Sequence, residues 1–193
     1  MGSGGIHEWP VFYKACHDHD EFVTLTDAEI NEAANFGSEM YESSQERGLN
    51  DRRPEIRNGV DGRRVQMLGS VAERACSKAL GIEWTHWMDT FRTPDLHHNI
   101  EVRLIGVNHY GLRVYDKDHD SRRVVGVVIE KGKEREAYRI PGWINAIYGK
   151  KERYKIDPHN KGQPVYAVPQ DKLQPLDTLK FLVNAEKVFG IGK

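Results

Sequence analysis

Cysteine, long apolar runs and net charge are all scarce in this sequence. Its two cysteines, Cys16 and Cys76, are too few for a disulfide scaffold. They favour a reducing compartment, so we expect a cytoplasmic protein. No stretch approaches the roughly 20 consecutive apolar residues that a membrane span requires. The start also lacks the charged and apolar regions of a secretory signal. We therefore expect neither membrane insertion nor classical secretion.

The formal net charge of −1 excludes an overall basic field, but the charges are unevenly distributed. Residues 1–50 contain two basic and ten acidic side chains, a net charge of −8. The rest of the 193-residue chain carries 26 basic and 19 acidic side chains, a net charge of +7. A basic domain attracts polyanions. An acidic segment of this kind can mimic DNA and cover the basic surface in the resting state.

Local sequence patterns predict helices at both ends of the chain and strands between them. A capping-box pattern at Thr26 and Glu29 begins a helix that ends near Arg47. A connector at 51–61 leads to a second helix, Gly62–Leu80, whose apolar stripe stops at Gly81. Alternating apolar residues then predict an antiparallel meander of strands at Asn99–Gly106, Gly111–Asp116 and Arg123–Glu130. Shorter elements follow: a strand at Ala137–Ile140, a helix from Pro141 to about Tyr148, a strand at Pro164–Val168 and a helix at Asp171–Val183 that Pro175 can split.

These elements predict a single α+β fold. We place a flexible start and an acidic helical extension in residues 1–61, and the core domain in residues 62–193. The oligomeric state is left open, with a homodimer among the assemblies allowed.

The residues with the clearest chemical potential lie at 93–103. Glu101 and Arg103 are two positions apart on a predicted strand, so their side chains share one face. If the chain turns at Leu96–Asn99, Asp95 comes to lie beside Glu101. Two neighbouring carboxylates form the oxygen-rich site that Mg²⁺ prefers. A metal held there could polarise a phosphate oxygen and activate a water molecule.

The second predicted helix adds a third acid. Glu73 falls at the margin of the apolar stripe instead of on the solvated side. A carboxylate that leans toward the core needs a partner, which a metal ion or a basic group at the same site would provide.

These motifs, taken in order, resemble the PD-(D/E)XK nuclease superfamily. The resemblance covers residues 62–180 and consists of Gly69-x-x-x-Glu73, then Pro94-Asp95, then Glu101-Val102-Arg103. The Glu-Val-Arg triplet, an Asp-x-Asp turn, Gly142-Trp143 and Val168-Pro169-Gln170-x-x-Leu173 are also similar to small uncharacterised proteins of phages and environmental sequences.

The resemblance implies a restriction-endonuclease-like core, in which helices flank a central mixed sheet with an antiparallel meander. It further implies a Mg²⁺- or Mn²⁺-dependent nuclease that hydrolyses phosphodiester bonds of DNA, in the host cytoplasm if phage-encoded. Asp95, Glu101 and the backbone carbonyl of Val102 would be the metal ligands, and Glu73 an auxiliary carboxylate. Arg103 stands where the family has lysine.

Arginine at this position leaves a second function open. Arg103 stays protonated and grips phosphate through a planar fork, so it can stabilise negative charge but is a poor proton acceptor. The alternative is a catalytically inactive nuclease-like DNA-binding or protein-interaction module. A small protein-binding domain without any nucleic-acid role is a third reading.

Several other groups have both a functional and a structural interpretation. The basic residues Lys150, Lys151, Arg153 and Lys155 predict contacts with a phosphate backbone or form a solvated loop. His97 and His98 could contact phosphate, but we expect an exposed turn. Cys16–Asp20 is read as a solvated acidic loop and Asp116–Asp120 as a hairpin turn, since both lack complete metal-ligand sets. For Trp84, Trp87 and Trp143, core packing is preferred to stacking on bases.

Overall fold

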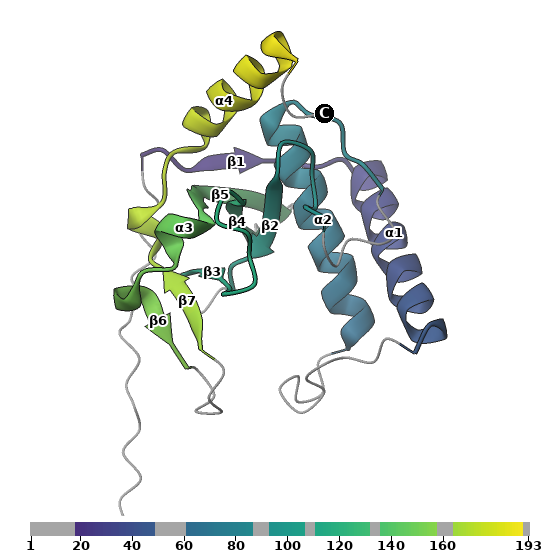
Figure 1. The fold of residues 1–193 in the computed structure, drawn as a ribbon. Helices are drawn as coiled ribbons and strands as arrows, with labels where there is room; N and C mark the ends of the chain where they lie inside the picture. Colours follow the sequence, from purple (N-terminus) through teal and green to yellow (C-terminus); the bar gives the residue numbers. More distant parts are fainter. Residues whose placement is uncertain are drawn as a thin grey trace, which may run out of the picture.

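The computed structural model describes residues 18–48, 61–86, 93–106, 111–131, 136–157 and 164–190. Within these residues the chain forms the predicted α+β fold, with one mixed and one antiparallel sheet (Figure 1). The mixed sheet has the order β1 (Glu21–Val23), β5 (Glu136–Asn145), β4 (Arg123–Lys131), β2 (Ile100–Leu104), and the small sheet the order β3 (Leu112–Val114), β7 (Val165–Val168), β6 (Lys155–Ile156). The helices are α1 (Asp27–Glu46), α2 (Gly62–Leu80), α3 (Ala146–Gly149) and α4 (Leu176–Phe189), with short 3₁₀ turns at Glu152–Tyr154 and Gln170–Lys172.

The two N-terminal helices are confirmed where local capping signals predicted them. The Thr26 hydroxyl accepts the N–H of Glu29 at 3.2 Å, and the Glu29 carboxylate accepts the N–H of Thr26 at 2.8 Å. Helix α2 begins after Asp61, whose side chain accepts the N–H of Arg63, and ends at Gly81 in a left-handed conformation. These contacts satisfy backbone groups that a helix end leaves unpaired.

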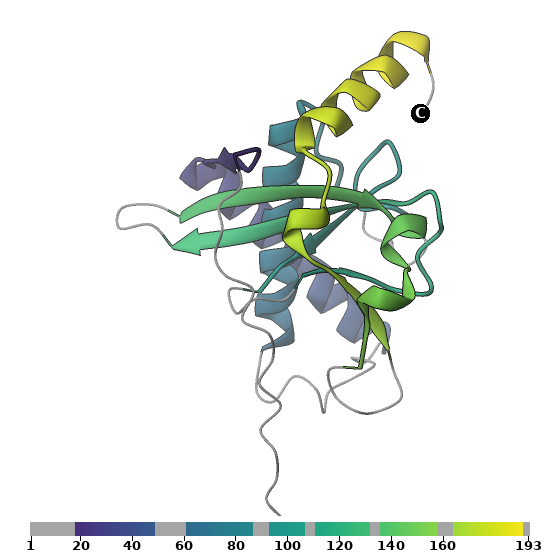
Figure 2. The same ribbon diagram turned by 90° about the vertical axis from the view of Figure 1, so that its left-hand side faces the viewer.

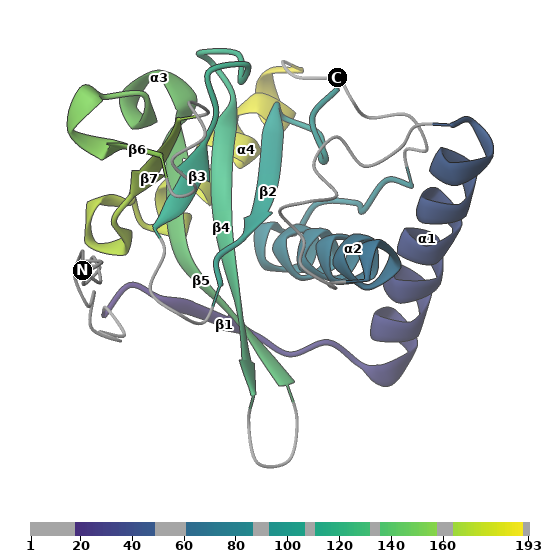
Figure 3. The same cartoon turned by 90° about the horizontal axis from the view of Figure 1, so that it is seen from below.

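The molecule is layered around the mixed sheet. Helix α2 lies between the sheet and α1, which forms the outermost layer (Figure 3). One core fills the helical side, and a second core joins the opposite face of the mixed sheet to the small sheet. Strand β4 serves both cores by simple alternation: Val125 and Val127 face the helices, whereas Val124 and Val128 face the small sheet.

Strand β1 and helix α1 belong to this same architecture. Strand β1 pairs antiparallel with β5, and Ala33 and Phe36 of α1 are buried in the core beside Trp84. Segments on both sides of the predicted boundary at residue 61 therefore share one sheet and one core. Predictions for Cys16, His17, Trp87 and the connector at 51–60 fall outside the described residues.

The predicted antiparallel meander is wrong. Strand β2 pairs in parallel with β4, with Val102 opposite Val125, while β3 leaves this sheet and pairs with β7. The chain between β2 and β4 therefore makes a crossover through the small sheet. Alternation of apolar residues identified the strands, but it contains no information about which strands pair.

The helix predicted from Pro141 is also wrong, because β5 runs through to Asn145. The register of the β4–β5 pairing shifts between Gly126 and Val128, opposite Pro141. This irregularity accommodates proline, which has no N–H to donate to the neighbouring strand. At Gly142 the chain segment of Gln174 crosses so closely that a Cβ atom would lie 2.3 Å from its carbonyl oxygen. Only the single turn of α3 remains helical.

The last helix begins later than predicted. Residues Gln170–Lys172 form a separate 3₁₀ turn, and α4 starts after Pro175, which occupies its N-cap. Its far end projects beyond the body of the molecule (Figure 2). The exposed apolar side chains of this helix are Phe181, Val188 and Phe189.

Acidic side chains of the N-terminal segment pair with basic side chains of the rest of the chain. Glu29 contacts both Arg74 and Lys78 of α2. The further pairs are Asp20 with Arg139, Glu21 with Lys180, Glu32 with His86 and Glu42 with Arg63. Asp20 is thus buried beside Arg139, so the reading of this residue as part of a solvated loop is wrong.

Glu29 links the stability of the α1–α2 pair to pH. Its hydrogen bond with Lys78 and that with the Thr26 backbone lower its pKa from 4.5 to about 2. Because the folded-state pKa lies below the unfolded value, this stabilisation is complete above about pH 5 and is lost as pH falls toward 2. Glu29→Gln preserves the capping box. We expect it to lower the melting temperature at pH 7 but hardly at pH 2; an equal loss at both pH values would contradict this.

Candidate active site

A tight turn brings the predicted acidic residues together. Leu96 and Ile100 exchange backbone hydrogen bonds at 3.0 and 3.4 Å, so the chain doubles back over three residues. His98 and Asn99 have φ values of 63° and 58°, in the left-handed region that asparagine tolerates better than most residues. The Asn99 amide donates to the carbonyl of Ser121 at 2.9 Å. The predicted reversal of the chain before β2 is confirmed.

Asp95 is held against the free edge of β2. Its Oδ2 atom accepts the N–H of Val102 at 2.8 Å. Strand β2 is the last strand of the mixed sheet, so its outer side has no strand neighbour among the described residues. The N–H and C=O of one strand residue point to the same side in a parallel ladder. The carbonyl of Val102 therefore also faces the free edge, on the side of Asp95.

Glu73 approaches the same place from α2. Burial and the negative charge of Asp95 raise its pKa well above 4.5, with a smaller contribution from Glu101. Burial, followed by the charge of Glu101, raises the pKa of Asp95 to about 7. The Val102 N–H, Arg103 and Arg122 act in the opposite direction. Carboxyl groups from three separate elements thus lie close together, and burial and neighbouring negative charge oppose the ionisation of Glu73 and Asp95.

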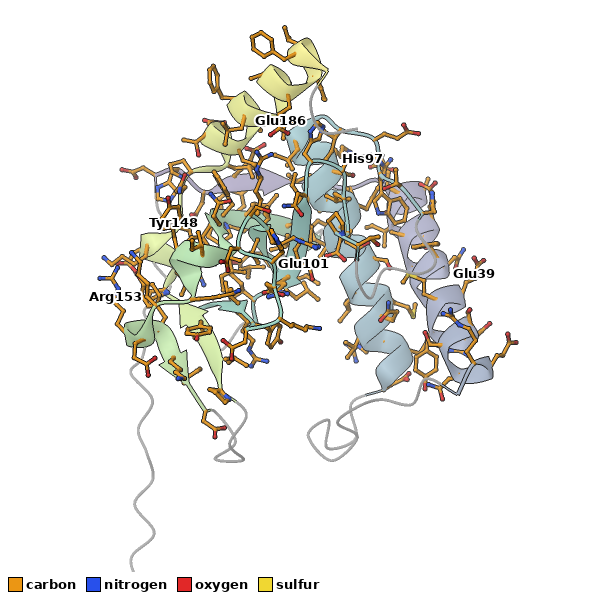
Figure 4. The ribbon with its side chains drawn as sticks, viewed as in Figure 1. Glu39, His97, Glu101, Tyr148, Arg153 and Glu186 are labelled. Atoms are coloured by element: carbon orange, nitrogen blue, oxygen red, sulfur yellow. The ribbon has the colours of Figure 1, made fainter. Side chains whose placement is uncertain are left out.

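Two guanidinium groups cover the third carboxylate, one on each oxygen. Arg103 Nη2 lies 3.1 Å from Glu101 Oε1, and Arg122 Nη1 lies 3.0 Å from Glu101 Oε2. Glu101 stands near the centre of the molecule, between α2 and the small sheet (Figure 4). Like Arg103, it extends from the face of β2 that looks toward the small sheet, as its spacing predicted.

Arg103 is fixed by a second carboxylate. Its two Nη atoms contact the two oxygens of Asp118 at 2.7 and 2.8 Å, and Nη1 also donates to the carbonyl of Arg113. The guanidinium lies over the ring of Tyr115, 4.5 Å from its centre. Burial works to lower the pKa of Arg103, but the hydrogen bonds and charge of Asp118 outweigh it and raise the pKa. Arg103 is therefore a permanently charged, oriented group.

Asp118 and Arg122 are the residues that sequence analysis missed. Asp118 lies in Asp116–Asp120, which was read as a hairpin turn, and Arg122 follows it. The segment instead connects β3 and β4, which belong to different sheets. The side chain of Asp118 is 5% exposed because it faces Arg103. The Asp-x-Asp spacing was visible in the sequence, but only the crossover shows that Asp118 points inward.

The histidines and tryptophans have structural partners. His98 Nδ1 lies 2.9 Å from Glu186 of α4, and its side chain is 8% exposed, so the expected exposed turn is wrong for this residue. Figure 4 shows Glu186 and His97 on the same upper side of the molecule. Trp84 and Trp143 are buried in the helical-side core, as preferred from the sequence.

The predicted nucleic-acid-binding residues divide into two groups. Lys150 donates to the Asp118 carbonyl and to Asp120, and Lys155 pairs with Glu152. Lys151 and Arg153 are exposed and lie beside the rings of Tyr148 and Tyr154. Tyr148 and Arg153 flank the molecule on the side of the small sheet (Figure 4).

The site has the donor chemistry of a hard-cation site, but it is not arranged as one. In the part of the chain that the structure describes, no three His, Cys, Asp or Glu side chains are grouped so as to hold a metal ion. The available donors are carboxylate oxygens and the Val102 carbonyl, which suit Mg²⁺ or Mn²⁺. Burial and then repulsion between the carboxylates raise the pKa values of Asp95 and Glu73, and a divalent cation would offset the repulsion. The described residues therefore supply oxygen donors of the type that such an ion prefers, but they do not form a metal site.

None of the described helices combines the length and the apolar character that crossing a bilayer requires. No family model matches the sequence, and no curated protein or solved structure is significantly similar to the chain.

Proposed function

We propose that the protein is a metal-dependent nuclease that hydrolyses phosphodiester bonds of DNA at the Asp95–Glu101 site. The observation that carries this proposal is the convergence of Glu73, Asp95 and Glu101 from α2, a turn and β2. Gathering like charges in a part-buried place opposes folding. Functional sites are where such arrangements are concentrated.

Each residue has a defined role in this proposal. Asp95, Glu101 and the carbonyl of Val102 would hold Mg²⁺ or Mn²⁺, with Glu73 as an auxiliary carboxylate. The ion would supply polarisation of a phosphate oxygen and activation of water. Arg103, oriented by Asp118, would stabilise negative charge on the phosphate without accepting a proton. Lys151 and Arg153 would contact the DNA backbone.

The order of elements supports the finer fold assignment within this proposal. Helix α2 with Glu73, the turn with Asp95 and strand β2 with Glu101 follow one another as expected for a restriction-endonuclease-like core. The central sheet is mixed and has helices packed against it. Strand β3 departs from the expected pattern because it lies in the second sheet.

A catalytically inactive, nuclease-like DNA-binding or protein-interaction module is the second candidate. The specific observation in its favour is that arginines occupy both oxygens of Glu101. A binder of DNA would show salt-dependent affinity that EDTA leaves unchanged, whereas the nuclease needs a divalent cation for turnover.

Cleavage of labelled duplex and single-stranded DNA in Mg²⁺, Mn²⁺ or EDTA tests the proposal. We expect metal-dependent cleavage by the parent protein. Asp95→Asn and Glu101→Ala should lower the rate by at least about a hundredfold, because loss of a ligand costs more than loss of an outer-shell partner. Asp120→Asn, at an acid whose side chain is 60% exposed, is the matched control. If Asp95→Asn still cleaves DNA, the site assignment is wrong. If the folded parent protein does not cleave DNA with any of these metals, the binding module is favoured.

A further inference from the structure

A surface beside the candidate active site carries cations that the rest of the protein does not neutralise. Lys117, Lys151 and Arg153 are exposed, and none of the three contacts an acid among the described residues. By contrast, Lys155 and Lys172 of the same region are each paired with a neighbouring acid. A cation without a carboxylate partner remains available to an anion from outside the molecule.

Each of these three cations lies over a tyrosine ring, at 4.8 to 5.9 Å from the ring centre. The pairs are Lys117 with Tyr115, Lys151 with Tyr148 and Arg153 with Tyr154. A comparable pair on the helical side, Arg63 over Tyr41 of α1, is neutralised by Glu42 at 2.8 Å. Unpaired cations interleaved with aromatic rings are typical of surfaces that bind single-stranded nucleic acid.

Tyr148 is the ring that a nucleic-acid base can reach. It is 53% exposed, and Ile147 beside it is 51% exposed. Tyr154 instead packs against the core of the small sheet, and the guanidinium of Arg103 lies over the ring of Tyr115. One exposed aromatic ring with an apolar neighbour therefore stands among the unpaired cations.

The surface is joined directly to the segment that covers Glu101. Helix α3 begins at Ala146, whose N–H donates to the carbonyl of Arg122 at 2.8 Å, and the side chain of Arg122 contacts Glu101. Tyr148 belongs to the same short helix. Figure 4 shows Tyr148 toward the side of the molecule and Glu101 near its centre. A strand held at Tyr148 is thereby placed beside the candidate site.

We infer that this surface binds single-stranded DNA, with one base stacked on Tyr148. The phosphates lie against Lys117, Lys151 and Arg153. This inference rests on the function proposed above and identifies its substrate as a single strand. Stacking on a side chain requires an exposed base face, which a duplex keeps inside its base stack. The contact of an exposed cation with a ring is weak, so Lys151 can move from Tyr148 to a phosphate and leave a ring face to the base.

Fluorescence anisotropy in EDTA tests this inference without metal or cleavage. The labelled probes are oligothymidylate, an abasic strand of equal length and the duplex of oligothymidylate with its complement. The parent should bind oligothymidylate most tightly, because this probe alone offers accessible bases. Tyr148→Ala should weaken that binding roughly tenfold, as expected for one stacked base, and leave binding of the abasic strand unchanged. Tyr148→Phe keeps the ring and should bind like the parent.

Two further variants serve as controls. Lys151→Ala removes a phosphate contact and should weaken binding of oligothymidylate and of the abasic strand equally. Tyr41→Ala removes the ring from the neutralised pair on α1 and should bind every probe like the parent. Circular dichroism confirms that each variant is folded.

The outcomes separate this inference from the proposed function. If the parent binds the abasic strand as tightly as oligothymidylate, or if Tyr148→Ala binds like the parent, the stacking is overturned. Equal or tighter binding of the duplex overturns the assignment to a single strand, and tighter binding of oligouridylate overturns the assignment to DNA. If the expected binding is found but the parent cleaves no DNA in Mg²⁺ or Mn²⁺, the binding surface stands and the nuclease activity does not.

Discussion

Asp118→Ala should destabilise the protein by about 3 kcal/mol, the cost of breaking a buried ion pair from one side. Arg103 would keep its charge but lose the two hydrogen bonds that match its fork, and the N–H of Tyr115 would lose its acceptor. The same change should lower cleavage, because Arg103 would no longer be oriented beside Glu101. Urea denaturation at pH 7 measures the free energy of unfolding.

Two further variants make this prediction specific. Asp120→Ala removes an exposed acid of the same segment and should lower the free energy of unfolding far less than Asp118→Ala, because exposed ion pairs contribute little. Combining Asp118→Leu with Arg103→Met should recover part of the lost stability, since an apolar pair of similar volume leaves no charge unpaired. If Asp118→Ala lowers the free energy of unfolding no more than Asp120→Ala does, the ion pair between Asp118 and Arg103 does not stabilise the site.

Asp95→Asn should have the opposite effect and stabilise the protein at neutral pH. The carboxyl of Asp95 has its pKa raised from 3.8 to about 7, first by burial and then by Glu101. From about pH 4 to 7 the unfolded chain is ionised here while the folded chain holds the proton, so stability falls as pH rises. Asparagine does not ionise, so the variant does not lose stability in this way, and its side-chain oxygen can still accept the Val102 N–H.

The gain from Asp95→Asn should be small at pH 4, grow up to about pH 7 and stay constant above it. A shift of this size corresponds to on the order of 2 to 4 kcal/mol at pH 8. Saturating Mg²⁺ should raise the melting temperature of the parent but not of the variant. Asp177→Asn, at an acid whose side chain is 87% exposed, should change little at any pH. A gain independent of pH would contradict the assignment of the raised pKa.

Local signals predicted local structure well. The capping box at Thr26 and Glu29 and the stop at Gly81 gave the ends of α1 and α2, since these contacts join residues a few positions apart. The turn before β2 was also local, which is why the meeting of Asp95 with the β2 edge was predictable. Pairing of β2 with β4 depends on chain segments more than 20 residues apart, and no local pattern encodes it.

The part of the site that escaped prediction follows from that one topological error. With β3 placed beside β2 in a meander, Asp116–Asp120 becomes a hairpin turn. The crossover to the small sheet instead folds this segment over Glu101 and brings in Asp118 and Arg122. The carboxylates and Arg103 were found because they lie on α2, the turn before β2 and β2 itself, which local patterns predict. Asp118 and Arg122 were missed because they come from a different segment.

The ion pairs between the N-terminal segment and the rest of the chain change the meaning of the charge distribution along the sequence. Asp20, Glu21, Glu29, Glu32 and Glu42 meet basic partners from beyond residue 61. Part of the contrast of −8 against +7 is therefore offset within the fold, and these acids act as part of the scaffold. Deleting residues 1–50 would remove an edge strand and a packed helix and leave Arg139 buried without Asp20. If DNA affinity rose after such a deletion, the cause would be lysines and arginines that the opened core exposes, and not the removal of a separate DNA-mimicking segment.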